Sequence, residues 1–106
     1  MRADNFKTIR KVLTAGVGQE ILAANATKRR ELKSVQITSD ANTKVDFYFG
    51  ASPNDLNALG CGDIPAFGGS NVMWNGNGPI SAINQPLNID IVGAANVRVY
   101  VTYQEE

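Results

Sequence analysis

The sequence contains no histidine. Its carboxylates are therefore the side chains to consider first for acid–base catalysis or metal binding. Between the basic first third and the C-terminal tail they stand singly, at Asp40, Asp46, Asp55, Asp63 and Asp90. A glycosidase needs two carboxylates that face each other across a sugar, and this spacing does not indicate such a pair. Asp55 and Asp63 could hold a calcium ion together with backbone carbonyls. Helix caps and turns explain isolated aspartates more simply, so we expect neither a catalytic centre nor a bound metal.

The single cysteine, Cys61, stands between two glycines in a stretch that we interpret as a loop. One cysteine cannot form an intramolecular disulfide, and without histidine no side chain is available to activate the thiol in the usual way. The glycine pairs at 60/62 and 68/69 lack the Lys and Ser/Thr that a phosphate-binding loop needs. We therefore expect a protein that is not an enzyme and needs no cofactor.

The charged residues are unevenly distributed although the formal net charge is zero. Residues 1–33 hold eight basic and three acidic residues, and the remainder holds two basic and seven acidic residues. The densest basic cluster is Lys28-Arg29-Arg30. No aromatic residues are interleaved with it, which disfavours a nucleic-acid partner, whereas arginine pairs well with carboxylates on a protein. Such a layout can orient the protein on a partner or on a second copy of itself.

Alternation is the dominant pattern of the chain. Apolar residues alternate with polar ones in three runs, which are 45–49, 87–91 and 97–103. A period of two places one face of a strand in a core and the other toward solvent or a partner. Residues 29–39 are a further expected strand. In it, Leu32 has the opposite parity to Val35 and Ile37, and a bulge near Lys33-Ser34 would place all three on one face.

These runs predict an all-β, antiparallel fold of about eight short strands. A two-sheet sandwich, including the jelly-roll arrangement, or a small barrel would accommodate them. Ser52, Pro53 and Gly60 are typical helix-boundary residues and predict one short helix near 53–59, inside a long loop over 51–69. We assign residues 1–8 to an N-terminal arm and 9–106 to a single β-sandwich domain. No apolar run is long enough to span a membrane.

Several residues are candidates for contacts with a partner. Tyr48 and Tyr100 have the polar parity of their strands, and aromatic residues are enriched at interfaces. Phe6 and Arg10 lie in the basic first third, and Phe6 could anchor the arm to a neighbour. Trp74 shares its parity with Val72, which favours a place in the core over a carbohydrate-stacking role. The full candidate set is Phe6, Arg10, Lys28, Arg29, Arg30, Tyr48 and Tyr100.

The order of segments resembles that of small β-sandwich structural proteins of tailed-bacteriophage virions. The resemblance covers about residues 19–102 and is carried by the stretches EILAAN (20–25), KRREL (28–32), VQITS (35–39), VDFYFG (45–50), GPISAI (78–83) and VRVYVT (97–102). None of these is a catalytic motif, and no functional residue is transferred from the family.

The resemblance implies a virion component made in the cytoplasm of a bacterial host. The expected function is that of a capsid decoration protein that binds the major capsid protein, stabilises the head and forms a homo-oligomer. The alternative is a tail, neck or fibre component that acts as a receptor- or carbohydrate-binding module. The arm, the 51–69 loop and the separated charges are the expected contact regions.

Overall fold

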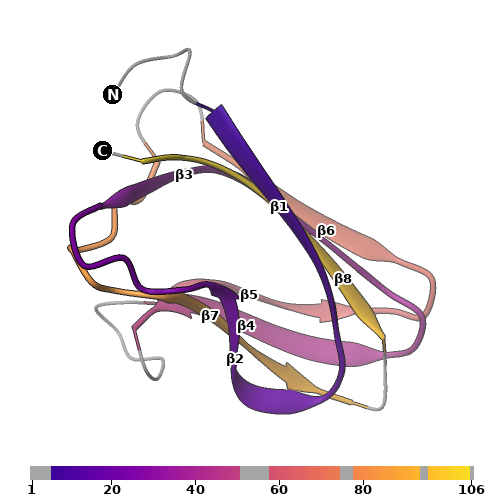
Figure 1. Ribbon diagram of the computed structural model, residues 1–106. Coiled ribbons are helices and arrows are strands. Elements are labelled where there is room, and N and C mark those ends of the chain that lie inside the picture. Colours follow the sequence, from indigo (N-terminus) through magenta and orange to yellow (C-terminus); the bar gives the residue numbers. More distant parts are fainter. Residues whose placement is uncertain (1–5, 51–57, 75–77, 94–95, 106) are drawn as a thin grey trace.

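The chain forms two layers of strands in the computed structural model, which describes residues 6–50, 58–74, 78–93 and 96–105 (Figure 1). Within these residues there are strands, turns and bends but no helix. The eight strands are β1 (Phe6–Leu13), β2 (Gly16–Leu22), β3 (Arg30–Ser39), β4 (Thr43–Phe49), β5 (Ala58–Ile64), β6 (Gly69–Met73), β7 (Leu87–Val92) and β8 (Val97–Glu105).

The strands make two four-stranded antiparallel sheets, in the orders β1-β8-β3-β6 and β2-β7-β4-β5. The pairs β1/β8, β2/β7, β3/β6 and β4/β5 are nested, as if one long hairpin had been rolled around a core. This order is that of a jelly roll. The predicted two-sheet sandwich is confirmed, and the strand order, which the sequence left open, selects the jelly roll.

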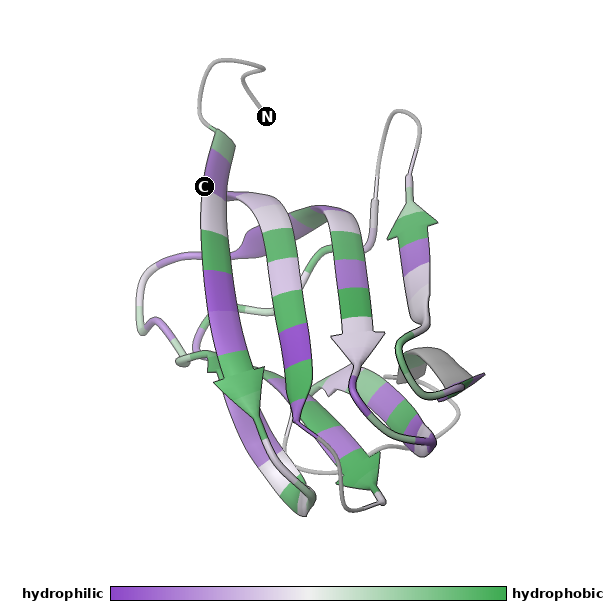
Figure 2. Cartoon of the chain, turned by 90° about the vertical axis from the view of Figure 1, so that its right-hand side faces the viewer, coloured by the Kyte–Doolittle hydropathy of each residue, from purple (hydrophilic) through white to green (hydrophobic). Residues whose placement is uncertain are grey.

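The core lies between the sheets and is built by the alternating residues. In Figure 2 the alternation is visible as green and purple bands along the strands. The inward set on the later strands includes Val45, Phe47, Ile89, Val99 and Val101, each at most 4% exposed. Trp74 and Tyr103 are half-buried and pack against this core, as their parity favours. Burying one such side chain contributes about 1.5–3 kcal/mol relative to leaving it in water.

The predicted bulge in β3 is confirmed. The register of β3 against β8 shifts by one residue between Leu32 and Ser34. Leu32, Val35 and Ile37 are consequently all buried, despite their opposite parities in the sequence. The extra residue, Lys33, accepts a hydrogen bond from the backbone N–H of Trp74 on its carbonyl (3.0 Å).

Beyond the bulge, the segment that contains Pro79 pairs with the start of β3. The N–H of Leu32 donates to the carbonyl of Pro79 (2.9 Å), and the N–H of Ser81 donates to the carbonyl of Arg30 (2.8 Å). Gly78 is required here, because a Cβ at this position would lie 1.8 Å from the carbonyl oxygen of Leu32. Close backbone approach is a reason for glycine that a sequence does not reveal.

Three sequence-based boundaries need correction. Phe6, Lys7 and Thr8 belong to β1 and not to an arm, since they pair with β8 from Thr102 to Gln104. The predicted helix is wrong at its C-terminal end, where Ala58 and Leu59 are in β5, and residues 53–57 lie outside the described residues. The stretch 51–69 is likewise not one long loop, because β5 runs through it and contains Cys61.

Candidate contact surfaces

The outer face of the β1-β8-β3-β6 sheet combines two arginines with exposed apolar side chains. Arg10 lies opposite Tyr100, and Val12 lies opposite Arg98, so the two arginines are diagonal neighbours on β1 and β8. Their outward direction follows from the inward direction of Val99 and Val101. We call this surface the basic face and define it by Arg10, Val12, Arg98, Tyr100 and Met73.

Apolar exposure is high on the basic face. Val12 is 59% exposed, Tyr100 40% and Met73 68%. Phe6, at the other end of β1, is 53% exposed. Among the described strand residues of this outward parity the sole carboxylate is Glu31, which is buried and ion-paired with Lys33. The predictions for Phe6, Arg10 and Tyr100 thus fall on side chains that are accessible to a partner.

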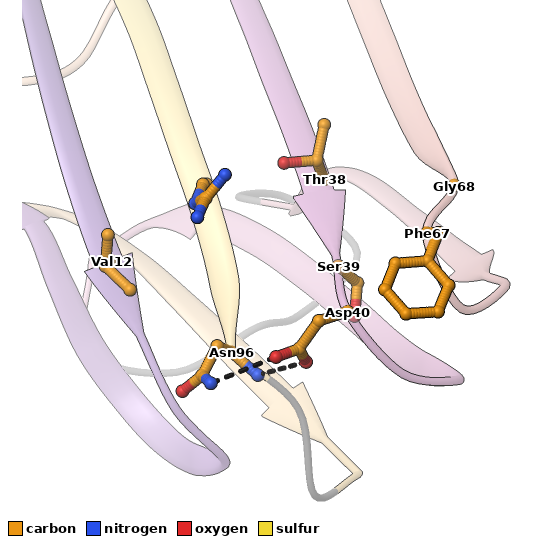
Figure 3. A pocket seen from close by; sticks show the side chains of 8 residues that line it. Val12, Thr38, Ser39, Asp40, Phe67, Gly68 and Asn96 are labelled. Carbon is orange, nitrogen blue, oxygen red and sulfur yellow. Dashed lines mark hydrogen bonds between the residues drawn. The ribbon is translucent and has the colours of Figure 1, made fainter.

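A pocket of about 670 Å³ lies at one end of the basic face. Its lining comes from four separate parts of the chain, as Figure 3 shows: Val12 on β1, the end of β3 with Asp40 after it, the β5–β6 turn, and the start of β8 with Asn96 before it. Asp40 links two of these parts, the β3–β4 connection and the segment before β8. The backbone N–H and the side-chain amide of Asn96 donate to the two carboxylate oxygens of Asp40, at 2.7 and 3.0 Å. These hydrogen bonds, the backbone one first, lower the pKa of Asp40 below its usual value.

Phe67 stands at the rim of this pocket in an unusual backbone conformation. The N–H of Gly68 donates to the carbonyl of Pro65 (2.9 Å), which closes a β-turn with Phe67 at its third position. There φ is +59°, a value at which glycine or asparagine is expected and a bulky residue is rare. The side chain is nevertheless 89% exposed, so it gains almost nothing from packing within this chain. A strained, exposed aromatic residue is therefore a candidate for a contact with a partner.

Sequence reasoning missed Phe67 and the pocket. The one available signal was an aromatic residue directly before Gly68-Gly69 in a region already singled out for contacts. The convergence of Asp40 with Asn96 could not be read from the sequence, because 56 positions separate them.

The outer face of the second sheet has the opposite charge. Asp46 on β4 lies directly opposite Asp90 on β7, and Lys44 lies between Asp63 on β5 and Val92 on β7. Glu20 on β2 shares this face, because it pairs with Asn88. We call this surface the acidic face and define it by Glu20, Lys44, Asp46, Asp63 and Asp90.

Tyr48 is not an accessible contact residue, and its prediction is wrong. It has the outward parity of β4 but is 0% exposed. Its hydroxyl donates to Oδ1 of Asp90 (2.6 Å), and the backbone N–H of Gly18 donates to the same oxygen (2.7 Å). Burial and, next, the bond to Asp90 raise the pKa of Tyr48 to about 12. Tyr48 therefore stabilises the contact between β4 and β7 and is not accessible to a partner.

The predicted basic cluster is divided by the fold. Lys28 and Arg29 are exposed in the β2–β3 connection. Arg30 is the second prediction to be corrected, since it is only 7% exposed and its Nε donates to Glu105 (3.0 Å). Glu105 also accepts from Lys7 (2.6 Å), so one carboxylate of β8 joins β1 to β3. The strand position of Arg30, opposite Glu105, explains its loss from the cluster.

The described residues contain no group of three or more cysteines, aspartates or glutamates that could hold a metal ion. Each of the two described pockets is lined by one carboxylate, Asp40 in the first and Asp63 in the second. Asp46 and Asp90 do face each other, but on strand surface outside both pockets. No helix in the described part of the chain is long and apolar enough to cross a membrane.

Comparison with known proteins adds no family. The chain matches no protein-family model, and it has no significant sequence match among curated proteins. Its functional assignment therefore rests on the segment resemblance and on the surfaces described above.

Proposed function

We propose that this protein is a non-enzymatic structural component of a phage virion, namely a capsid decoration protein that binds the major capsid protein and stabilises the head. The observation that carries the proposal is the exposed ring of Phe67, held on a left-handed backbone at the end of the basic face. A rigid sandwich that presents such a residue is suited to hold onto another protein. The segment resemblance over residues 19–102 supplies the virion context, and the jelly roll is also used by viral capsid proteins.

Binding to expanded capsids that lack the protein tests this proposal. We expect the purified protein to co-sediment with such capsids and the Phe67→Asn variant to bind roughly tenfold more weakly or worse, since an aromatic anchor contributes 2 kcal/mol or more. Asparagine suits the left-handed backbone, so the variant should fold. Val17→Asn is the matched control, because Val17 is 79% exposed but lies on the other sheet. Wild-type protein that leaves the capsids bare would overturn the proposal.

A second candidate function is a receptor- or carbohydrate-binding module of a tail, neck or fibre. The pocket supports it, because Asp40, Asn96 and Arg98 provide planar polar groups in a pocket that Phe67 also lines. Trp74 does not support it, because Trp74 packs against the core. A glycan array distinguishes the two functions: saccharide binding that Asp40→Ala abolishes favours the module, and a blank array favours decoration.

A further inference from the structure

We propose that copies of this chain associate head to tail, with the basic face of one copy against the acidic face of the next. The two faces are the outer surfaces of the two layers, so they point away from each other (Figure 1). One presents Arg10 and Arg98, and the other presents Glu20, Asp46, Asp63 and Asp90 around Lys44, with Lys11 hydrogen-bonded to the carbonyl of Glu20 at its edge. Opposite charge on opposite sides of one molecule is complementary to a second copy.

The spacing of the charges also matches. Diagonal neighbours across an antiparallel pair, such as Arg10 and Arg98, have Cα atoms about 7–8 Å apart. Directly opposite residues, such as Asp46 and Asp90, have Cβ atoms about 4.5–5.5 Å apart. Arginine side chains are long enough to converge over that difference. Two guanidinium groups of one copy can therefore meet the two carboxylates of the next in charge-assisted hydrogen bonds.

The acidic face carries an unfavourable feature that such a partner would relieve. Like charges directly opposite on neighbouring strands destabilise a sheet, and Asp46 and Asp90 are such a pair. None of the ion pairs among the described residues includes either carboxylate. Asp90 receives hydrogen bonds from Tyr48 and Gly18, which fix its position without supplying a positive charge.

Apolar side chains accompany the charges on both faces. Tyr100 lies beside Arg10 in the basic face, and Val92 of β7, 63% exposed, borders Lys44 in the acidic face. Contacts between unlike faces are heterologous, so a pair of copies retains one free acidic face on one copy and one free basic face on the other. The assembly then continues into a ring if the rotation between copies closes, and into a filament if it does not.

Two charge-reversal variants, measured singly and as a mixture, test the inference. We expect Arg10→Asp and Asp46→Arg each to weaken self-association roughly tenfold or more, the effect of removing one close charge pair. Arg10→Asp retains an intact acidic face and Asp46→Arg an intact basic face. An equimolar mixture should therefore associate again, because these two intact faces bind each other and the two substituted faces have exchanged charges that are also complementary. Analytical ultracentrifugation in about 50 mM NaCl measures each species, and raising the salt to about 0.5 M should dissociate the wild-type assembly.

Arg29→Asp is the matched control, because it makes the same charge change at an exposed residue outside the basic face and should associate like wild type. Urea unfolding checks that each variant is folded. Self-association of Asp46→Arg alone, at wild-type strength, would overturn the inference, as would a mixture that stays monomeric or a wild-type protein that stays monomeric at low salt. The inference deepens the proposed virion role, but its assay contains no capsid, so either proposal can fail without the other.

Discussion

At the scale of single residues, Phe67 combines an unfavourable backbone conformation with an exposed side chain. Its backbone lies in the left-handed region, which costs a bulky residue on the order of 1–3 kcal/mol. Its ring is 89% exposed and offsets little of that cost within the chain. Glycine or asparagine would adopt this turn with less strain.

We therefore expect Phe67→Asn to increase the free energy of unfolding by about 0.5–1 kcal/mol, because asparagine tolerates φ of this sign. Urea unfolding followed by far-UV circular dichroism measures the change. Phe47→Ala gives the contrasting result, a loss of about 3–5 kcal/mol, because Phe47 is a core residue. A Phe67→Asn variant less stable than wild type would show that the ring packs against the protein after all.

Tyr48 leads to a prediction at high pH. Its pKa is about 12 in the fold, because burial and Asp90 favour the neutral phenol, whereas an unfolded tyrosine has a pKa of about 10. The unfolded chain thus loses this proton first. The stabilisation is complete below pH 10 and is lost as the pH rises from 10 to 12.

Tyr48→Phe should flatten that part of the pH dependence and cost about 1–2 kcal/mol at pH 7, where it removes the hydrogen bond to Asp90. Urea unfolding at pH 8, 10 and 11.5 tests both effects. Tyr100→Phe, at a 40% exposed position, should change the stability at pH 7 by less than about 0.5 kcal/mol. An unchanged high-pH slope in Tyr48→Phe would contradict the assignment.

At the scale of elements, Glu105 joins three strands of one sheet. Hydrogen bonds from Lys7 and, next, from Arg30 lower the pKa of Glu105. The stabilisation is therefore present above the unfolded pKa of about 4.3 and is lost as the pH falls through the lowered value in the fold. The Lys7 side chain is 57% exposed, so solvent screens its ion pair with Glu105. The ion pair with the buried Arg30 therefore contributes most of the stabilisation of the fold.

Glu105→Gln should cost about 3 kcal/mol at pH 7, because it leaves the buried Arg30 without its counter-charge. It should also reduce the loss of stability between pH 5 and pH 3, measured by urea unfolding. Asp63→Asn, at an exposed position, is the comparison and should stay within about 0.5 kcal/mol of wild type at pH 7. Equal acid sensitivity in Glu105→Gln and wild type would rule out this role.

Strand by strand, the sequence predicts best where local chemistry decides the structure. The alternating run 87–91 lies within β7, Leu87–Val92, and the β3 bulge followed from a parity break at Leu32. β5 was missed, because its sequence ALGCGDI has no alternation and is rich in glycine. Its place in the sheet comes from pairing with β4, which is a tertiary effect that overrides local propensity.

The candidate contact residues show the same division. Tyr100 and Arg10 are on the surface, as parity predicts, but Tyr48 has the same kind of parity and is buried. What distinguishes them is the bulged segment of β2 around Gly18, which reaches Asp90 beside Tyr48. Likewise, the partner of Arg30 is 75 positions away at Glu105. Neither contact can be predicted from the spacing of nearby residues in the sequence.

At the scale of the whole molecule, the nested pairing determines how the chain can fold. β4 and β5 are close in sequence, whereas β1 must find β8 across almost the full chain. Closing longer loops costs more entropy, so the inner pairs should form before the outer ones. Folds dominated by such non-local contacts fold in milliseconds to seconds.

Stopped-flow refolding tests this order. Val45→Ala in β4 should mainly slow folding, with a φ-value above about 0.5, whereas Ile9→Ala in β1 should mainly speed unfolding, with a φ-value below about 0.3. Both side chains belong to the core or pack against it, so both should give a measurable change in stability. The reverse pattern of φ-values would mean that the outermost pair nucleates folding.

The pairing of Phe6 with Gln104 has a consequence for engineering. It places the two ends of the described sandwich side by side, as Figure 1 shows, while the pocket lined by Val12 and Asn96 lies at the opposite end of the same strands. A cargo joined to the chain at Phe6 or Glu105 would therefore start at the end of the sandwich away from Phe67. A short linker between Phe6 and Glu105 would equally allow circular permutation, with new ends opened in the connection between β2 and β3.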